Sequence, residues 1–445
     1  MSPCEVEIVS YRQQLQQKIE ARQARVGIAG LGYVGLPLAA EFARAGFEVT
    51  GIDIDARKVA SLRRGESYIK DVHASVIQLL VDSGRLEATT DFSIVKDLDT
   101  INIAVPTPLR KTKDPDMSYV VDACREIARY VHPGLLIILE STVYPGATEE
   151  ALLPVLQESG LRVGEDFFLC FSPERVDPGN PAHHTRNIPK VVGGITPACT
   201  EIGALFYRQA LDSVVPVTST KVAEMVKLLE NTFRMINIGL VNEIALMSGS
   251  MGVDVWEVID AAATKPFGFM PFYPGPGLGG HCIPIDPFYL SWKSRQAGIE
   301  ARFIDLAGCI NGQMPHFVVE KIANALNGVC KSVKGSRVHI LGVAYKREID
   351  DIRESPALDI IHLLHKRGAT VTYSDPHVPV LHADGHLAFE LRSIPAELGA
   401  AEADCAAIIT DHKAFDYPAL LERTNLIVDT RNAFRGYTSP KIVRL

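Results

Sequence analysis

Short apolar runs, followed by segments with apolar residues at helical spacing, recur along the chain. Such runs are typical of buried parallel strands, and the segments between them are typical of crossover helices. The order therefore predicts an α/β fold with an open parallel sheet in the first half of the chain. Its strands are expected immediately before Gly30 and at residues 48–52, 100–105, 135–140, 167–171, 190–192 and 214–217.

Other stretches show an apolar stripe at helical spacing. Residues 221–251 contain no proline and predict a long central helix, and the chain is expected to be helical again from residue 282 to about 327. Residues 1–24 predict a short amphipathic helix that packs on the first domain. Its apolar face would be formed by Ile8, Tyr11, Leu15 and Ile19.

A second α/β unit is predicted towards the C-terminus. It has no second Gly-x-Gly-x-x-Gly sequence, but Lys346 and Arg431 follow two of its strands. Cations at strand ends would suit another phosphorylated ligand. The expected strands are residues 337–341, 370–374, 405–410 and 426–429, with a helix at 358–366.

Composition and charge narrow the class of protein. At 445 residues the chain is too long for one hydrophobic core, and its net charge of −8 argues against nucleic acid and anionic membranes as partners. The first ten residues do not form a secretion signal, and no apolar run of about 18 residues predicts a membrane span. The eight cysteines are dispersed, without metal-type spacing. We expect a cytoplasmic protein that binds no metal.

The first strand leads directly into a dinucleotide-binding fingerprint. Gly30, Gly32 and Gly35 form Gly-x-Gly-x-x-Gly at the start of a helix, and Asp53 ends the second strand. The pyrophosphate would lie at the helix N-terminus and Asp53 would bind the adenine ribose. A carboxylate there repels a 2′-phosphate, so NAD is favoured over NADP, although Lys58 weakens the preference slightly.

Three polar clusters follow strands of the predicted sheet, at residues 106–108, 140–142 and 172–175. Ligands lie beyond the carboxyl ends of parallel strands, which would bring these clusters to a cofactor crevice. Each cluster alone could equally be turn chemistry, with Ser and Thr capping and Pro breaking the strand. The three together favour a functional role.

A single thiol lies within a Gly- and Pro-rich loop, residues 274–287. A cysteine is usually a small buried hydrophobe, but here glycines would let backbone amides approach a ligand, and His281 and Asp286 flank Cys282. We interpret Cys282 as a nucleophile. Lys227 and Asn231 lie one turn apart on the central helix; such a pair is commonly just solvated, but it could stabilise an oxyanion.

These residues resemble the UDP-glucose/GDP-mannose dehydrogenase family over nearly the whole chain from residue 26 onward. The thiol loop is most similar to the branch that oxidises UDP-N-acetylhexosamines for bacterial surface polysaccharides, in particular UDP-N-acetyl-D-glucosamine. The resemblance is carried by the fingerprint, Val-Pro-Thr-Pro at 105–108, Glu-Ser-Thr at 140–142, Ser-Pro-Glu at 172–174, the Glu224, Lys227 and Asn231 motif, Gly-Gly-x-Cys at 279–282, and Lys346 with Arg353.

The resemblance implies two Rossmann-like domains joined by a long central helix and a helical middle domain. An N-terminal helical extension would span residues 1–24, an NAD-binding Rossmann domain 25–217, a central helical domain with the Cys loop 218–327, and a UDP-sugar-binding Rossmann-like domain 328–445. It also implies a homodimer or a higher homo-oligomer.

The implied reaction oxidises the sugar C6 alcohol to a carboxylate with two NAD, through a thiohemiacetal and a thioester on Cys282. The implied catalytic residues are Cys282, Lys227, Asn231, Asp286, Glu174 and Thr142. NAD would be bound by Gly30, Gly32, Tyr33, Val34, Gly35, Asp53, Lys58, Thr107, Thr142 and Arg353. The UDP-sugar would be bound by Glu174, Arg175, Lys227, Asn231, Tyr273, Gly275, Gly277, Gly279, Lys346 and Arg431.

The chain departs from the pattern of UDP-glucose members at residues 173–178 and at Ile285, where those proteins usually carry lysine. The departures favour a different hexose and leave the gluco, galacto and manno acetamido sugars open, as well as UDP-glucose itself. Two other classes remain: a two-electron hydroxy-acid dehydrogenase, and a sensor without turnover. The presence of Cys282, Lys227 and Asn231 argues against the sensor.

Overall fold

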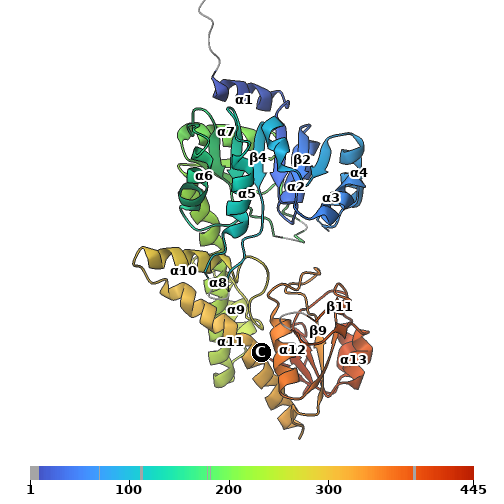
Figure 1. The fold of residues 1–445 in the computed structure, drawn as a ribbon. Coiled ribbons are helices and arrows are strands. Elements are labelled where there is room, and N and C mark those ends of the chain that lie inside the picture. Colours follow the sequence, from blue (N-terminus) through green and yellow to red (C-terminus); the bar gives the residue numbers. More distant parts are fainter. Residues whose placement is uncertain (1–9, 70, 111–113, 178, 181, 384–386) are drawn as a thin grey trace, which may run out of the picture. The chain divides into compact units, whose positions relative to one another are not determined.

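The computed structural model describes residues 10–69, 71–110, 114–177, 179–180, 182–383 and 387–445. The chain divides into two compact units. Unit 1 comprises Met1–Glu230 with Trp292–Ala297, and unit 2 comprises Asn231–Ser291 with Gly298–Leu445. Each unit contains one large sheet with helices around it (Figure 1), which confirms an α/β protein with two Rossmann-like sheets.

The sheet of unit 1 has eight strands in the order β3-β2-β1-β4-β5-β6-β7-β8. Neighbouring strands from β3 to β6 pair in parallel, as a doubly wound fold requires. The strands are β1 (Arg25–Ala29), β2 (Glu48–Ile52), β3 (Leu86–Thr89), β4 (Thr100–Ile103), β5 (Leu136–Leu139), β6 (Phe168–Phe171), β7 (Lys190–Gly194) and β8 (Val214–Val217).

The prediction of a fully parallel first sheet is wrong at one edge. β7 pairs antiparallel with β6 through Cys170 with Gly194 and Phe171 with Gly193, and β8 runs parallel to β7. The described part of residues 172–189 contains no helix. A parallel return needs a crossover, usually a helix, and this segment lacks one, so β7 runs in the opposite direction. Strand β3 was not predicted.

Helix α1 (Tyr11–Glu20) confirms the predicted N-terminal helix. Leu15 and Ile19 are buried in the core of unit 1, whereas Tyr11 is 41% exposed and Ile8 lies outside the described residues. Ser10 and Gln13 form a capping box at its start. The other helices before the long central one are α2 (Gly35–Arg44), α3 (Ala56–Arg63), α4 (Ala74–Asp82), α5 (Ser118–Ala128), α6 (Leu153–Gln157) and α7 (Pro197–Arg208), with short helical turns η1 (Phe92–Asp97) and η2 (Thr148–Leu152).

The long central helix is α8 (Thr220–Met251), as predicted, and its first turns belong to unit 1. Buried Glu224 fixes this end: its carboxylate accepts hydrogen bonds from the Gly146 amide and from the amide and hydroxyl of Thr148, the latter at 2.9 and 2.6 Å. Burial raises the pKa of Glu224, although these hydrogen bonds oppose the rise.

The sheet of unit 2 has five parallel strands in the order β10-β9-β13-β14-β15. The last strand was not predicted. The strands are β9 (Arg337–Leu341), β10 (Thr370–Ser374), β13 (Cys405–Ile408), β14 (Ile427–Asp429) and β15 (Ile442–Arg444), beside a small pair, β11 (Val380–Leu381) and β12 (Leu391–Arg392). The remaining helices are α9 (Val255–Ala262), α10 (Asp286–Gln296), α11 (Arg302–Gly328), α12 (Pro356–Lys366), α13 (Ala396–Glu402) and α14 (Tyr417–Arg423).

Among the described residues, no helix combines the length and apolar character that crossing a membrane requires.

Candidate active site

The fingerprint turn between β1 and α2 needs glycine at two positions for packing reasons. Gly30 has φ +94°, and a Cβ atom there would lie 2.4 Å from the carbonyl oxygen of Ala104. At Gly35 a Cβ would lie 1.8 Å from the carbonyl oxygen of Gly30. Both contacts are impossible for a side chain, so these glycines let the turn close against β4 and let α2 start directly above it.

Gly32 has no such packing reason. A Cβ at this position would meet nothing within 4 Å among the described residues. The adjacent Tyr33 is 45% exposed, and Val34 is half-buried at the N-cap of α2. An open backbone beside a helix N-terminus is the arrangement that lets a pyrophosphate approach. The residues therefore fit a dinucleotide.

Asp53 lies at the end of β2, beside the fingerprint. Its side chain is 7% exposed and accepts hydrogen bonds from the Leu31 amide at 2.9 Å, the Asp55 amide at 2.9 Å and Lys58 Nζ at 3.0 Å. The carboxylate is thus held on the fingerprint loop. The Lys58 ammonium group partly offsets the negative charge of this carboxylate.

The three predicted polar clusters follow β4, β5 and β6, which are neighbours in the sheet. The Ser141 hydroxyl donates to the carbonyl of Val105, the residue immediately before the first cluster, at 2.7 Å and so connects the second cluster to the start of the first. Thr107 is buried and Thr142 is half-buried. The Glu174 carboxylate accepts hydrogen bonds from the backbone amides of Arg175 and Val176 at 2.8 and 2.9 Å.

A buried lysine on β7, which the sequence did not single out, joins these clusters. Lys190 Nζ lies 2.6 Å from Glu140 and 3.3 Å from Glu174, and only 5% of its side chain is exposed. Burial lowers the pKa of Lys190, but the two carboxylates outweigh burial and raise it overall. Glu140 also accepts hydrogen bonds from Asn102, at 2.9 Å, and from the Tyr207 hydroxyl.

Lys190 and a second lysine, Lys227, both act on Glu174. Burial raises the pKa of Glu174, but Lys190, the two backbone amides and Lys227 together lower it below its ordinary value. Lys227, on α8, is 7% exposed. Two residues predicted for the catalytic site, Glu174 and Lys227, thus interact within unit 1. Arg175 is engaged elsewhere, with Glu230 at 2.6 Å and the Pro189 carbonyl at 2.7 Å.

In unit 2, Asn231 and Asp286 meet beside the thiol loop. Asn231 Nδ2 donates to Asp286 Oδ2 at 2.6 Å, and Asp286, the first residue of α10, is 2% exposed. The Cys282 carbonyl accepts hydrogen bonds from the backbone amides of Ile285 and Asp286 at 3.0 and 2.8 Å. Cys282 therefore lies in the turn that leads into α10. Its sulfur lies 4.0 Å from His281 Nδ1.

Cys282 differs in burial from most other described cysteines. Its side chain is half-buried, whereas Cys124, Cys170, Cys199 and Cys405 are buried. Burial raises the pKa of Cys124 and of Cys405 to about 12, which keeps those thiols protonated and inert. Exposed Cys309 and Cys330 lie outside the loop, and Cys4 lies outside the described residues.

The glycines of the thiol loop were expected to admit a ligand, but packing within unit 2 already explains several of them. A Cβ at Gly279 would lie 2.6 Å from Tyr345 Cβ, and one at Gly280, which has φ +90°, would lie 2.8 Å from the Tyr345 ring. Gly277 has φ +136° and faces Pro356. The loop thus packs tightly against the segment that follows β9.

The loop also meets one predicted substrate residue. A Cβ at Gly275 would lie 2.5 Å from Arg431 Nη1, so these two predicted residues are adjacent. Arg431 Nε donates to the Ile409 carbonyl at 2.8 Å, and burial lowers the pKa of this guanidinium, though it remains a cation near neutral pH. Lys346 is half-buried in the segment after β9.

Two predicted residues have their polar groups engaged elsewhere in unit 2. The Tyr273 hydroxyl donates to Asp260 at 2.9 Å, and its ring stacks on Trp256 at 5.7 Å between centroids. Arg353 is exposed and pairs with Asp351 at 2.6 Å. The backbone carbonyl of Arg353 nevertheless accepts a hydrogen bond from the Gly280 amide of the thiol loop at 3.0 Å. The predicted residues are thus divided between the two units.

Comparison with known families matches three successive models along the chain. The NAD binding domain of the UDP-glucose/GDP-mannose dehydrogenase family matches residues 24–211, its central domain matches 221–313, and its UDP binding domain matches 339–436. The chain belongs to the UDP-glucose/GDP-mannose dehydrogenase family. It is an NAD-dependent nucleotide-sugar dehydrogenase, with NAD as the cofactor.

Several relatives of this dehydrogenase act on different sugars. It is 38% identical to a UDP-N-acetyl-D-glucosamine 6-dehydrogenase of Pseudomonas aeruginosa, over 80% of this chain and 84% of the relative. It is 35% identical to a UDP-N-acetyl-D-mannosamine dehydrogenase of Salmonella typhi, over 92% and 99%. A solved UDP-D-ManNAc dehydrogenase from Pyrococcus horikoshii matches with a TM-score of 0.86 and 31% identity, over 94% of this chain and 98% of that one.

Proposed function

We propose that this chain oxidises the C6 hydroxyl of UDP-N-acetyl-D-glucosamine to the uronic acid in the cytoplasm, for synthesis of a surface polysaccharide such as O-antigen or capsule. The observation that carries the proposal is the half-buried thiol of Cys282 in the turn that leads into α10, whose first residue, Asp286, accepts a hydrogen bond from Asn231. The choice of sugar is supported by the 38% identity to a relative named for this substrate and by the thiol-loop sequence.

The reaction removes four electrons from one carbon. The alcohol, two NAD and one water become the carboxylate, two NADH and three protons. When bound, NAD accepts a hydride from C6 in each oxidation. The Cys282 thiolate adds to the aldehyde carbon formed first and holds it as a thiohemiacetal. After the second oxidation the sugar is a thioester, and water cleaves its carbon–sulfur bond to release the acid and the thiol.

The other predicted catalytic residues would act on the negative charge that develops on the C6 oxygen of the substrate, and on the attacking water. Lys227 and Asn231 would stabilise the negative oxygen that develops at each stage, and Asp286 would orient Asn231. Glu174 or Asp286 would accept a proton from the water that attacks the thioester, and Thr142 would contribute near that water.

Ligand binding would be divided between the predicted segments. Residues 25–217 would bind NAD through the fingerprint, Asp53 and Thr107, with Arg353 contributing from the C-terminal segment. Residues 328–445 would bind the UDP-sugar phosphates through Lys346 and Arg431. Residues 218–327 would present the sugar to Cys282, and the contacts predicted for Arg175, Tyr273, Gly275, Gly277 and Gly279 would fix its orientation.

The same chemistry on UDP-N-acetylmannosamine, UDP-N-acetylgalactosamine or UDP-glucose is the alternative. UDP-N-acetylmannosamine is supported by the similarity to the Salmonella typhi relative named for that substrate, which aligns over 92% of this chain and 99% of its own length.

The test compares kcat/KM for these four UDP-sugars with saturating NAD. The proposal requires the highest kcat/KM with UDP-N-acetylglucosamine, by a factor of about ten or more. The other three sugars differ from it in the group at C2 or in the hydroxyl at C4, and either change alters the polar contacts of a site. A higher value with an epimer would transfer the assignment to that sugar. No NADH from any of them would overturn the reaction itself.

We propose that the chain assembles as a homodimer or a higher homo-oligomer. Along α8, the exposed apolar residues Phe233, Leu240, Met247 and Met251 recur at helical spacing, with exposures of 47, 52, 43 and 67%. An apolar stripe of this kind on a surface helix is typical of an interface. Light scattering should give a mass of at least two chains, and Leu240→Asp should reduce it; a monomeric wild type would contradict the assembly.

A further inference from the structure

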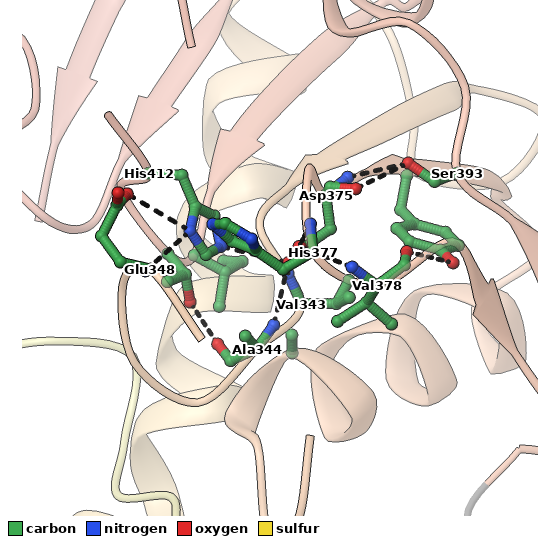
Figure 2. A network of polar contacts seen from close by, with 12 residues as sticks. Val343, Ala344, Glu348, Asp375, His377, Val378, Ser393 and His412 are labelled. Carbon is green, nitrogen blue, oxygen red and sulfur yellow. Dashed lines mark hydrogen bonds and ion pairs between the residues drawn. The ribbon is translucent and has the colours of Figure 1, made fainter. Parts of the chain in front are cut away.

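Outside the candidate active site, three side chains with metal-binding atoms converge in unit 2. One ligand atom from each of Glu348, His377 and His412 lies within 4.8 Å of the others. Figure 2 shows the cluster. Its residues come from the segments that follow β9, β10 and β13, which are neighbouring strands of one parallel sheet. Parallel strands bring these segments to one edge of the sheet although they are far apart in the sequence.

His412 is fixed by a carboxylate behind it. Its Nε2 lies 3.1 Å from Asp375 Oδ2, and both side chains are fully buried. The same carboxylate oxygen accepts the backbone amides of Val343 and Ala344 at 2.7 and 3.1 Å, so it acts as an acceptor and Nε2 carries the proton. Metal-binding histidines commonly have such a carboxylate on the ring nitrogen that faces away from the metal.

The other nitrogen of His412 is therefore the acceptor and faces the cluster. His412 Nδ1 accepts a hydrogen bond from the Glu348 backbone amide at 3.0 Å, and Glu348 Oε1 lies 3.8 Å from the same nitrogen. Glu348 is exposed and has φ +65°, a conformation that few residues other than glycine adopt. Glu348 Oε1 also accepts a hydrogen bond from the Lys413 backbone amide at 2.8 Å. A cation on Nδ1 would replace the hydrogen bond from the Glu348 amide, and the exposed carboxylate would turn onto the cation in exchange for its bond to Lys413.

His377 supplies the observation that points to a ligand. Its Nε2 atom is closed off from solvent and has no hydrogen-bond partner among the described residues. Its ring centroid lies 5.0 Å from that of His412. The backbone amide of His377 donates to Asp375 Oδ1 at 2.8 Å, so the residue is held in place by the same carboxylate that orients His412. A buried nitrogen without a partner is unfavourable unless a ligand satisfies it.

We propose that Glu348, His377 and His412 bind one divalent transition-metal ion of the zinc type. Two imidazole nitrogens and one carboxylate oxygen suit Zn²⁺ better than Mg²⁺ or Ca²⁺, which prefer oxygen ligands. Water would complete a tetrahedral set. This departs from our expectation that the chain binds no metal, which relied on the dispersed cysteines and their lack of metal-type spacing. The inference does not depend on the proposed function.

A metal ion in this site would restrain the segment that follows β9. Glu348 lies in this segment two residues after Lys346, while His377 and His412 follow β10 and β13. A bound ion would therefore join the ends of three strands and hold the segment in one conformation. Because the ligands are provided by the folded state, binding is expected to stabilise unit 2.

The experiment uses the full-length protein after treatment with a chelator. Zn²⁺ alone is titrated by calorimetry, with one ion per chain expected in this site. His377→Ala and Glu348→Gln should each weaken binding by about 100-fold or more, since loss of even a residue behind a ligand costs about 10- to 100-fold. The matched control is His362→Ala, which removes an exposed imidazole from α12 in the same unit.

Cobalt(II) in place of zinc identifies the ligands by absorption. A nitrogen and oxygen site gives visible bands, whereas ligation by a thiolate adds an intense near-ultraviolet band that would assign the ion to a cysteine. That band, equal zinc affinity in the wild type and His377→Ala, or no zinc binding by the wild type would each overturn the proposal. His377→Ala keeps the backbone hydrogen bond to Asp375, and thermal melts without metal should match those of the wild type.

Discussion

Asn231 on α8 donates a 2.6 Å hydrogen bond to Asp286, which begins α10 near the end of the thiol loop. The bond fixes the orientation of the Asn231 side-chain amide. Its NH2 group faces the buried Asp286 carboxylate, so the amide oxygen of Asn231 must face away from that carboxylate. The pair thus links the long helix to the loop that carries Cys282. A substitution on either side should disturb catalysis more than folding.

Asp286→Asn tests this link. It keeps the size of the side chain but removes the charge that orients Asn231. We expect kcat to fall by about 100-fold, with little change in KM for the UDP-sugar, because loss of one oxyanion donor typically costs about 10²–10³ in kcat. The control is Asn237→Ala on the same helix, whose amide donates to the Phe233 carbonyl. An unchanged kcat in Asp286→Asn would remove both residues from the mechanism.

Lys190→Met should destabilise unit 1 and shift the pH dependence of kcat. It removes the cation that Glu140 and Glu174 share, and breaking a buried ion pair typically costs about 3–5 kcal/mol. The pKa of Glu174 would rise without Lys190, so the acid side of the kcat profile should move to higher pH. Lys190→Arg should restore the profile. Lys221→Met, which removes an exposed partner of Glu149, should change neither property; an unmoved profile in Lys190→Met would contradict the role of Lys190.

His339 predicts how stability depends on pH. Burial lowers the pKa of this histidine from 6.5 to about 4, and its ring bonds the hydroxyls of Thr372 and Ser374. Between these values the unfolded chain binds a proton that the folded chain does not, so stability is lost as pH falls from about 6.5 to about 4. The full shift corresponds to about 3 kcal/mol. Urea midpoints across this range should fall less steeply in His339→Gln than in the wild type, whereas parallel curves would exclude His339 as the cause.

Asp53→Asn should weaken the preference for NAD over NADP. The variant keeps an oxygen that can accept from the Leu31 amide but loses the charge that repels a 2′-phosphate. We expect the ratio of kcat/KM for NAD to that for NADP to fall by about tenfold or more. Glu48→Gln, at the exposed opposite end of β2, is the control. An unchanged ratio would show that another group selects the cofactor.

Local geometry made part of the fold predictable. The strand before Gly30, the helix from Gly35 and the acid at position 53 follow from short-range constraints, and each is present at its expected place. The direction of β7 was not predictable in the same way. It depends on whether a crossover links it to β6, and the apolar run of a strand carries no information about direction.

Pairs of charges that meet across a sheet were the least predictable part of the candidate site. Lys190 is the first residue of an ordinary apolar strand, and only the pairing of strands shows that it lies between Glu140 and Glu174. In the thiol loop, by contrast, the sequence indicated the important residues but not the reason for them. Its glycines were noticed in the sequence for ligand access, yet Tyr345, distant in sequence, explains two of them by packing.

The most direct measurement of the central claim is the number of NADH formed per UDP-N-acetylglucosamine consumed, for the wild type and for Cys282→Ser. The proposed mechanism predicts two NADH per sugar for the wild type. Cys282→Ser should yield at most one, or stall on an ester-like intermediate visible by mass spectrometry. One NADH per sugar in the wild type, or full turnover with two NADH in Cys282→Ser, would contradict covalent catalysis by Cys282.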